Sequence, residues 1–339
     1  MSRGVQSALA STVAILLAAS GSHLVVSWLK IKTTASLPFT IGKPNGKPRA
    51  FLAGSSLATY GISWQQIAKE VDMEIKVWGI AGGSPFEWEQ FQKRVPDAGT
   101  TFIVVSAYDL DESMICDFRA DLVPMSDTIK TLLTIHADWD YSERALSQYP
   151  ITWLRTLFPT LGRSRGIMGD LRIKIKNSIW PSAGTSETEA GPTLKFGQTD
   201  PDDEYKKQRI SDWSKSKMAG KIIAMRASFR GGQSFCGPKK LALERMLQFA
   251  DERGQTVVVV LPVSASYSKE FMLPENVRKF EDALAEAQRA ASRAQWLRVD
   301  QVSAFNADEN FCDLVHMNVF AQQTITEAFL AWLKPPARQ

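Results

Sequence analysis

Apolar segments of strand length alternate with amphipathic segments of helix length along most of this chain, and this alternation constrains the fold more than any other feature. The predicted strands are 49–54, 74–80, 101–107, 255–263 and 295–299, and the predicted helices are 63–71, 85–94, 239–253, 275–294 and 318–333. Strands separated by helices of this length imply right-handed βαβ units and a parallel sheet covered on both faces. We therefore predict a three-layer α/β/α fold with a central parallel sheet of about five strands.

Residues 1–32 are predicted to be an N-terminal membrane anchor, because 5–29 contains no Asp, Glu, Lys or Arg. At about 1.5 Å per residue, a helix of this length crosses a bilayer. The alternative is a cleaved signal peptide with its cleavage site at 18–20. The apolar run resumes beyond that site, at 24–29, which favours a single transmembrane helix that is retained. Basic residues are more numerous after this segment than before it, and the positive-inside rule would therefore keep the domain in the cytoplasm. Large domains, however, translocate largely regardless of nearby charge, so this rule does not fix the orientation.

The remainder of the chain is predicted to be a linker at 33–47 and one domain at 48–339. Pro and Gly are frequent in the linker, and the strand–helix rhythm breaks down in a long insertion at 110–237, after the third strand. Within the insertion, basic and aromatic residues interleave at 153–176, which is consistent with a membrane interface or with a helix packed on its own domain. The net charge of +4 gives no case for nucleic acid as a partner.

Two short motifs lie at corresponding ends of the predicted α/β domain. Gly54-Ser55-Ser56-Leu57 follows the first strand, and Asp313-Leu314-Val315-His316 comes just before the last helix. Either motif alone is commonly a turn or a surface pair. In an open parallel sheet, however, ligands bind outside the carboxyl ends of the strands, and both motifs are expected there. A histidine base in acyl chemistry needs a carboxylate to fix its tautomer, so we predict a Ser56–His316–Asp313 triad.

These motifs resemble the SGNH (GDSL-type) hydrolase superfamily over roughly 49–334 without the insertion. The first block is Gly54-Ser55-Ser56-Leu57, with Ser55 where Asp is usual, and the last is Asp313-Leu314-Val315-His316. The segment Gly79-Ile80-Ala81-Gly82-Gly83-Ser84 is similar to the second block, which implies that the amides of Gly82 and Ser56 form an oxyanion hole. The resemblance also implies a flavodoxin-like sheet, no metal and no cofactor, and supporting roles for Ser55, Gly79 and Asn318.

The third block departs from the family pattern. Where Gly-x-Asn-Asp is expected, this chain has Ser106-Ala107-Tyr108-Asp109, so the oxyanion-binding Asn is absent. Tyr108 is either a phenolic donor to the oxyanion or an aromatic residue that covers the end of the strand. The metal-ligand alternative at His136, Asp138 and Asp140 has a single His with two acids, a combination that commonly occurs by chance.

Within the superfamily, the Gly-Ser-Ser form, the Tyr and the anchor are most similar to the branch that acylates cell-surface polymers. This implies a serine acyltransferase at the inner (cytoplasmic) membrane with its domain in the periplasm. A polysaccharide or other surface glycan would be the acceptor, and a membrane-bound O-acyltransferase would be the partner. The alternatives are an esterase that uses water as the acyl acceptor, and a non-catalytic scaffold in an acylation or export complex.

Overall fold

The computed structural model describes residues 39–41, 49–80, 83–95, 97–113, 125–134, 204–229 and 232–333, with a few further residues between 139 and 150. All the strands belong to one compact unit, 38–142 and 196–339. The predicted anchor, the 153–176 segment and the His136–Asp140 alternative lie outside the described residues. Among the residues that are described, no helix is long and apolar enough to cross a membrane.

The sheet has six strands in the spatial order β1-β3-β2-β4-β5-β6. Their bounds are β1 Phe39–Ile41, β2 Arg49–Ser55, β3 Glu74–Ile80, β4 Thr100–Val105, β5 Gln255–Val260 and β6 Gln295–Arg298. The last five pair in parallel, whereas β1 runs antiparallel to β3. If the five parallel strands are numbered 1 to 5 along the chain, their spatial order across the sheet is 2-1-3-4-5. This is one of the two common orders of doubly wound sheets.

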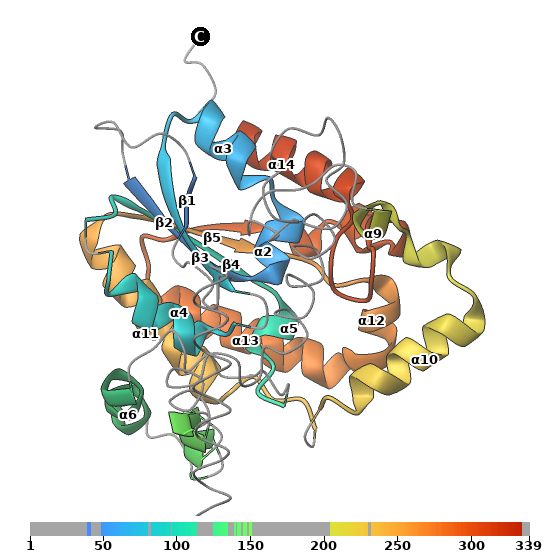
Figure 1. The fold of residues 1–339 in the computed structure, drawn as a ribbon, viewed down its shortest axis with the longest axis horizontal. Coiled ribbons are helices and arrows are strands. Elements are labelled where there is room, and N and C mark those ends of the chain that lie inside the picture. Colours follow the sequence, from blue (N-terminus) through green and yellow to red (C-terminus); the bar gives the residue numbers. More distant parts are fainter. Residues whose placement is uncertain are drawn as a thin grey trace, which may run out of the picture. The chain divides into compact units, whose positions relative to one another are not determined.

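Helices cover both faces of the sheet (Figure 1). On one face lie α2 (Ser56–Gly61), α3 (Trp64–Glu70) and α14 (Val319–Leu333), where α14 packs against the other two. On the other face, α11 (Pro238–Arg253) packs against α4 (Pro85–Gln92) and α13 (Pro274–Ala290). The predicted α/β fold with three layers and five parallel strands is confirmed.

The connection from β4 to β5 is much longer than those between the other parallel strands. Its described helices before α11 are α5 (Ala107–Leu110), α6 (Met125–Thr134), α9 (Glu204–Lys207) and α10 (Lys215–Arg226). A 3₁₀ turn at Ile210–Asp212 separates α9 from α10, and α12 (Ala265–Phe271) follows β5.

Two features of this architecture differ from the sequence-based expectation. The segment predicted as a linker contributes β1, whose three residues extend the sheet beyond β3 by main-chain pairing. Such pairing needs no distinctive side chains, so it leaves little trace in the sequence. The third and fourth predicted strands end earlier than expected, at Val105 and Val260, and Ser106 and Ser264 then cap the short helices that follow.

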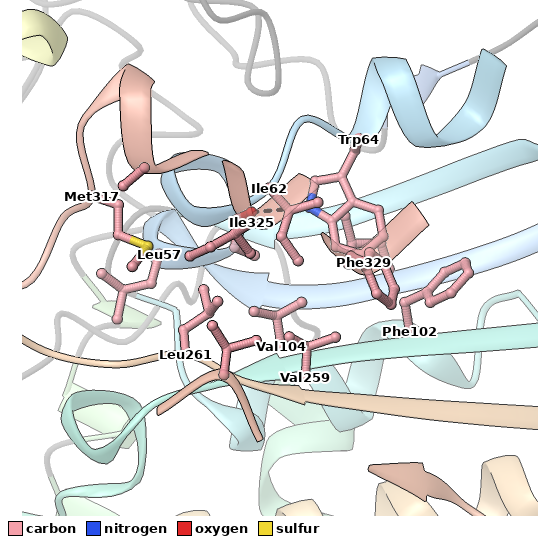
Figure 2. Packing of buried hydrophobic residues seen from close by; sticks show 14 of the residues in the cluster. Leu57, Ile62, Trp64, Phe102, Val104, Val259, Leu261, Met317, Ile325 and Phe329 are labelled. Carbon is pink, nitrogen blue, oxygen red and sulfur yellow. Dashed lines mark hydrogen bonds between the residues drawn. The ribbon is translucent and has the colours of Figure 1, made fainter. Parts of the chain in front are cut away.

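The core on the α2–α3–α14 face is built from alternate residues of the strands. Leu52 of β2, Phe102 and Val104 of β4, and Val259 of β5 are almost fully buried there, as the period of two in a strand requires. Figure 2 shows Trp64 and Phe329 against this layer, and the Trp64 indole donates a 2.9 Å hydrogen bond to a carbonyl of α2. This packing holds α2 at the carboxyl end of β2.

The central position of β2 determines where a ligand can bind. From β2 the chain passes to β3 on one side and afterwards to β4 on the other. A crevice forms outside the carboxyl ends of the strands at such a switch point. Ser56, the first residue after β2, stands at this position.

Candidate active site

The predicted nucleophile begins a helix that is held by its neighbours. Ser55 is the N-cap of α2, and its hydroxyl accepts a 3.1 Å hydrogen bond from the Leu57 amide. Ser56 comes next and is partly exposed, whereas Leu57 is buried in the core of Figure 2. At the other end of the helix, Gln322 of α14 donates a 2.5 Å hydrogen bond to the Thr59 carbonyl. These contacts fix the direction in which Ser56 projects.

Close packing around Gly54 explains why the residue two before Ser56 is a glycine. A Cβ at this position would lie 2.5 Å from the Cβ of Ala58 and 3.3 Å from the carbonyl oxygen of Val104. Gly54 pairs with Gly79 across β2 and β3, so these two neighbouring residues near the carboxyl ends of the strands both lack side chains. The chain can therefore turn from β2 directly into α2 without displacing β4.

The predicted acid and base lie in a small closed loop between β6 and α14, here named the base loop (311–317). Phe311 and Met317 form an isolated antiparallel bridge, and the Cys312 amide donates to the His316 carbonyl at 2.9 Å. The two residues between Asp313 and His316 are almost fully buried, so they anchor the loop in the core. Asp313 folds back on the loop, and its Oδ1 accepts hydrogen bonds from two backbone amides of the loop, those of residues 315 and 316, at 2.9 and 2.7 Å.

Ser56, His316 and Asp313 form a continuous chain of hydrogen bonds. The Ser56 Oγ lies 2.7 Å from His316 Nε2, and His316 Nδ1 lies 2.8 Å from Asp313 Oδ2. An ionised carboxylate only accepts hydrogen bonds, so Nδ1 carries the proton and donates to Asp313. The lone pair of Nε2 then faces the Ser56 hydroxyl. This is the arrangement in which a histidine can take a proton from a serine.

Asp313 remains ionised although it is mostly buried. Burial is the largest single influence and opposes its ionisation, whereas the hydrogen bond and charge interaction with His316 favour it. The Tyr205 hydroxyl and the His316 amide contribute further hydrogen bonds. Together these donors hold the pKa of Asp313 well below its usual range, so the carboxylate can orient His316 throughout the physiological pH range.

Asn318, predicted as a supporting residue, connects the loop to its surroundings. Its side chain is fully buried, and its Oδ1 accepts a 3.1 Å hydrogen bond from the Ala321 amide in the first turn of α14. Its Nδ2 donates to the carbonyls of Glu309 and Gln208 at 2.6 and 3.4 Å. Asn318 therefore holds the base loop to the start of α14, and none of these hydrogen bonds involves a triad residue.

A buried carboxylate that the sequence analysis assigned no role lies beneath the nucleophile. Asp109 accepts hydrogen bonds from the Ser106 amide and hydroxyl at 3.0 and 3.1 Å, and it also bonds the Ser55 side chain. Burial raises the pKa of Asp109 to about 6, although these hydrogen bonds and the charge of Lys239 oppose the rise. A serine at position 55 suits this carboxylate, because an aspartate there would place two negative charges together.

Tyr60 and Tyr205, which the sequence analysis did not select, contact the triad, and Lys206 lies beside Tyr60. The Tyr60 ring packs against His316 with its centroid 4.5 Å away, and the Lys206 ammonium lies 5.2 Å from the Tyr60 ring. Tyr205 donates to Asp313 Oδ2 at 2.5 Å. Tyr205 and Lys206 belong to α9, more than 100 residues before the base loop, so no local pattern in the sequence indicates their contact with it.

The oxyanion residues of the predicted site are only partly described. Gly82 lies outside the described residues, so its amide stays a prediction. Tyr108 is in α5, just after β4, where its half-buried ring packs edge-on against Tyr267 with the centroids 6.3 Å apart. Its predicted role as a donor to the oxyanion also stays a prediction.

Among the described residues, no cluster of three or more His, Cys, Asp or Glu side chains has a geometry suited to a metal ion. Comparison of the chain with protein-family models and with curated protein sequences finds no match.

Proposed function

We propose that this chain is a serine acyltransferase that works through an acyl-enzyme on Ser56. The observation that carries the proposal is the hydrogen-bonded chain Ser56–His316–Asp313 at the switch point of the sheet. The doubly wound strand order and the positions of the motifs support membership of the SGNH superfamily with its flavodoxin-like sheet. Asp72 is the one non-glycine residue of the described part with a positive φ, so Ser56 lacks the strained backbone of an α/β-hydrolase nucleophile elbow.

The proposed reaction has two halves that use the same groups. His316 Nε2 takes the proton of Ser56 while Oγ attacks the acyl carbonyl, and the amides of Ser56 and Gly82 stabilise the oxyanion, with Tyr108 as a further donor. The intermediate collapses, the leaving group takes the proton from His316, and an acyl ester remains on Ser56. An acceptor hydroxyl then gives its proton to His316 and attacks the ester. As the bond from the acyl carbon to Ser56 Oγ breaks, His316 returns the proton to Oγ and restores the hydroxyl. Asp313 stabilises the charged histidine in both halves.

The acceptor and location follow from the resemblance and are part of the proposal. We infer O-acetyl transfer to a cell-surface or exported polysaccharide, with 5–29 as a single-pass anchor in the inner membrane and the domain in the periplasm. A membrane-bound O-acyltransferase would supply the acyl group. Hydrolysis by the same triad requires only that water replaces the sugar hydroxyl, so an esterase is the alternative outcome.

Labelling with a fluorophosphonate tests the nucleophile directly. Full-length protein in mild detergent is expected to form one adduct, on Ser56, and Ser56→Ala is expected to form none. Ser63→Ala is a matched control, because Ser63 makes no side-chain capping hydrogen bond at the start of α3 and lies outside the triad. Labelling that persists in Ser56→Ala would show that another side chain is the nucleophile, whereas folded wild-type protein without a Ser56 adduct would favour a non-catalytic scaffold. With an activated acetyl ester as donor, acetyl transfer to added polysaccharide separates a transferase from an esterase.

A further inference from the structure

The short helix α9 contacts the acid of the triad directly through Tyr205, and Lys206, the next residue, reaches the base only through the ring of Tyr60. The Tyr205 hydroxyl donates to Asp313, although 39% of the Tyr205 residue is exposed. Lys206 is only 8% exposed, and its ammonium lies over the ring of Tyr60, which in turn packs on His316. The Ile210 amide, just after α9, donates to the Phe311 carbonyl at 2.9 Å and holds this segment against the base loop.

Tyr205 completes the hydrogen bonding of the Asp313 carboxylate. Oδ1 accepts from two backbone amides of the loop, and Oδ2 accepts from His316 Nδ1 and from the Tyr205 hydroxyl. Two donors on each oxygen restrict rotation of the carboxylate about its Cβ–Cγ bond. Burial and the charge of Asp313 raise the pKa of Tyr205 above its usual value, so the hydroxyl keeps its proton and remains a donor.

The role of Tyr205 inferred from these contacts rests on the proposed triad and adds a residue to it. We propose that Tyr205 is a positioning residue that acts on the reaction through Asp313 and makes no contact with the substrate. Its hydroxyl holds the carboxylate in the plane that His316 requires. It also shares Oδ2 with His316, and therefore reduces the negative charge that faces the imidazole ring.

Tyr205→Phe removes the hydroxyl and keeps the ring. We expect kcat for hydrolysis of p-nitrophenyl acetate by the full-length protein to fall on the order of 10-fold, as for loss of a charge-assisted hydrogen bond. KM should stay within about two-fold, because the substrate is not contacted. The carboxylate would then direct more negative charge at His316 and favour its protonated form. The acidic limb of the pH–rate profile should therefore move to higher pH.

A control and a double variant separate positioning from a purely structural effect. Ser211→Ala removes an exposed hydroxyl from the neighbouring 3₁₀ turn and should leave kcat and the pH profile unchanged. In an Asp313→Asn background, Tyr205→Phe should cause no further loss in the rate of fluorophosphonate labelling, because its effect passes through Asp313.

Two results would overturn the inference while the proposed function stands. One is a Tyr205→Phe protein that is labelled on Ser56 at the wild-type rate and has an unshifted acidic limb. The other is an equal fold-loss from Tyr205→Phe in the wild-type and Asp313→Asn backgrounds. Absence of any Ser56 adduct in wild-type protein would instead overturn both the proposed function and the role of Tyr205.

Discussion

The replacement Asp109→Asn should change how the stability of this protein depends on pH. Asp109 is buried beneath Ser55 and Ser106, and burial raises its pKa from 3.8 to about 6. The folded protein therefore binds this proton more tightly than the unfolded chain does. Such a group contributes stability that is fully present below about pH 4 and is lost as the pH rises through about 6.

The size of the effect follows from the difference between the two pKa values. One pKa unit corresponds to about 1.4 kcal/mol, so a rise of about two units corresponds to about 3 kcal/mol. The free energy of unfolding of Asp109→Asn, relative to wild type, should therefore increase by about 3 kcal/mol between pH 4 and pH 8. Asn keeps an acceptor for the Ser106 amide but carries no charge, so it lacks this dependence.

Urea unfolding followed by tryptophan fluorescence measures this difference, since Trp64 and Trp88 are fully buried. Glu112→Gln is an informative comparison, because burial raises the pKa of Glu112 to about 7 and its loss of stability falls in a higher pH window, between about 4.5 and 7. Asp109→Asn should retain that second dependence. The reasoning would be refuted if the stability difference between wild type and Asp109→Asn were the same at pH 4 and pH 8, or if it changed in the opposite direction.

Three further replacements test the framework of the site. Gly54→Ala would force a methyl group against Ala58, so we expect a loss of about 1–3 kcal/mol in unfolding free energy and slower labelling of Ser56 as α2 shifts. Asn318→Ala removes the cap of α14, and urea unfolding should show a loss of about 1–2 kcal/mol; unchanged stability would contradict the capping role. Phe329→Ala empties part of the core in Figure 2 and should cost about 3–5 kcal/mol, with a measured loss below 1 kcal/mol arguing against the packing described.

Much of the fold could be predicted because its determinants are local. The five parallel strands and the helices between them follow from apolar periodicity, and β3 at Glu74–Ile80 has the bounds that were predicted. The helix at Val319–Leu333 begins one residue later than expected because Asn318 serves as its cap. The edge strand β1 was missed, because three residues paired by main-chain hydrogen bonds have no periodicity to detect.

The sequence also indicated which motifs belong at the rim of the sheet, because parallel strands place the residues that follow them at one edge. It could not supply the contacts made there. Ser56 and His316 are 260 positions apart, and their 2.7 Å contact depends on how α14 packs against α2. Tyr205 approaches Asp313 from another distant segment, 108 positions away.

The sequence by itself thus determined the class of fold, the order of its strands and helices and the spacing of Asp313 and His316, all of which depend on neighbouring residues. Only the tertiary structure decided that Ser56 reaches His316, that Tyr205 bonds Asp313, and that Asp109 lies buried beneath Ser55. The physical reason is that periodicity and capping act over a few residues, whereas hydrogen bonding and burial at the site depend on segments brought together by packing of the core.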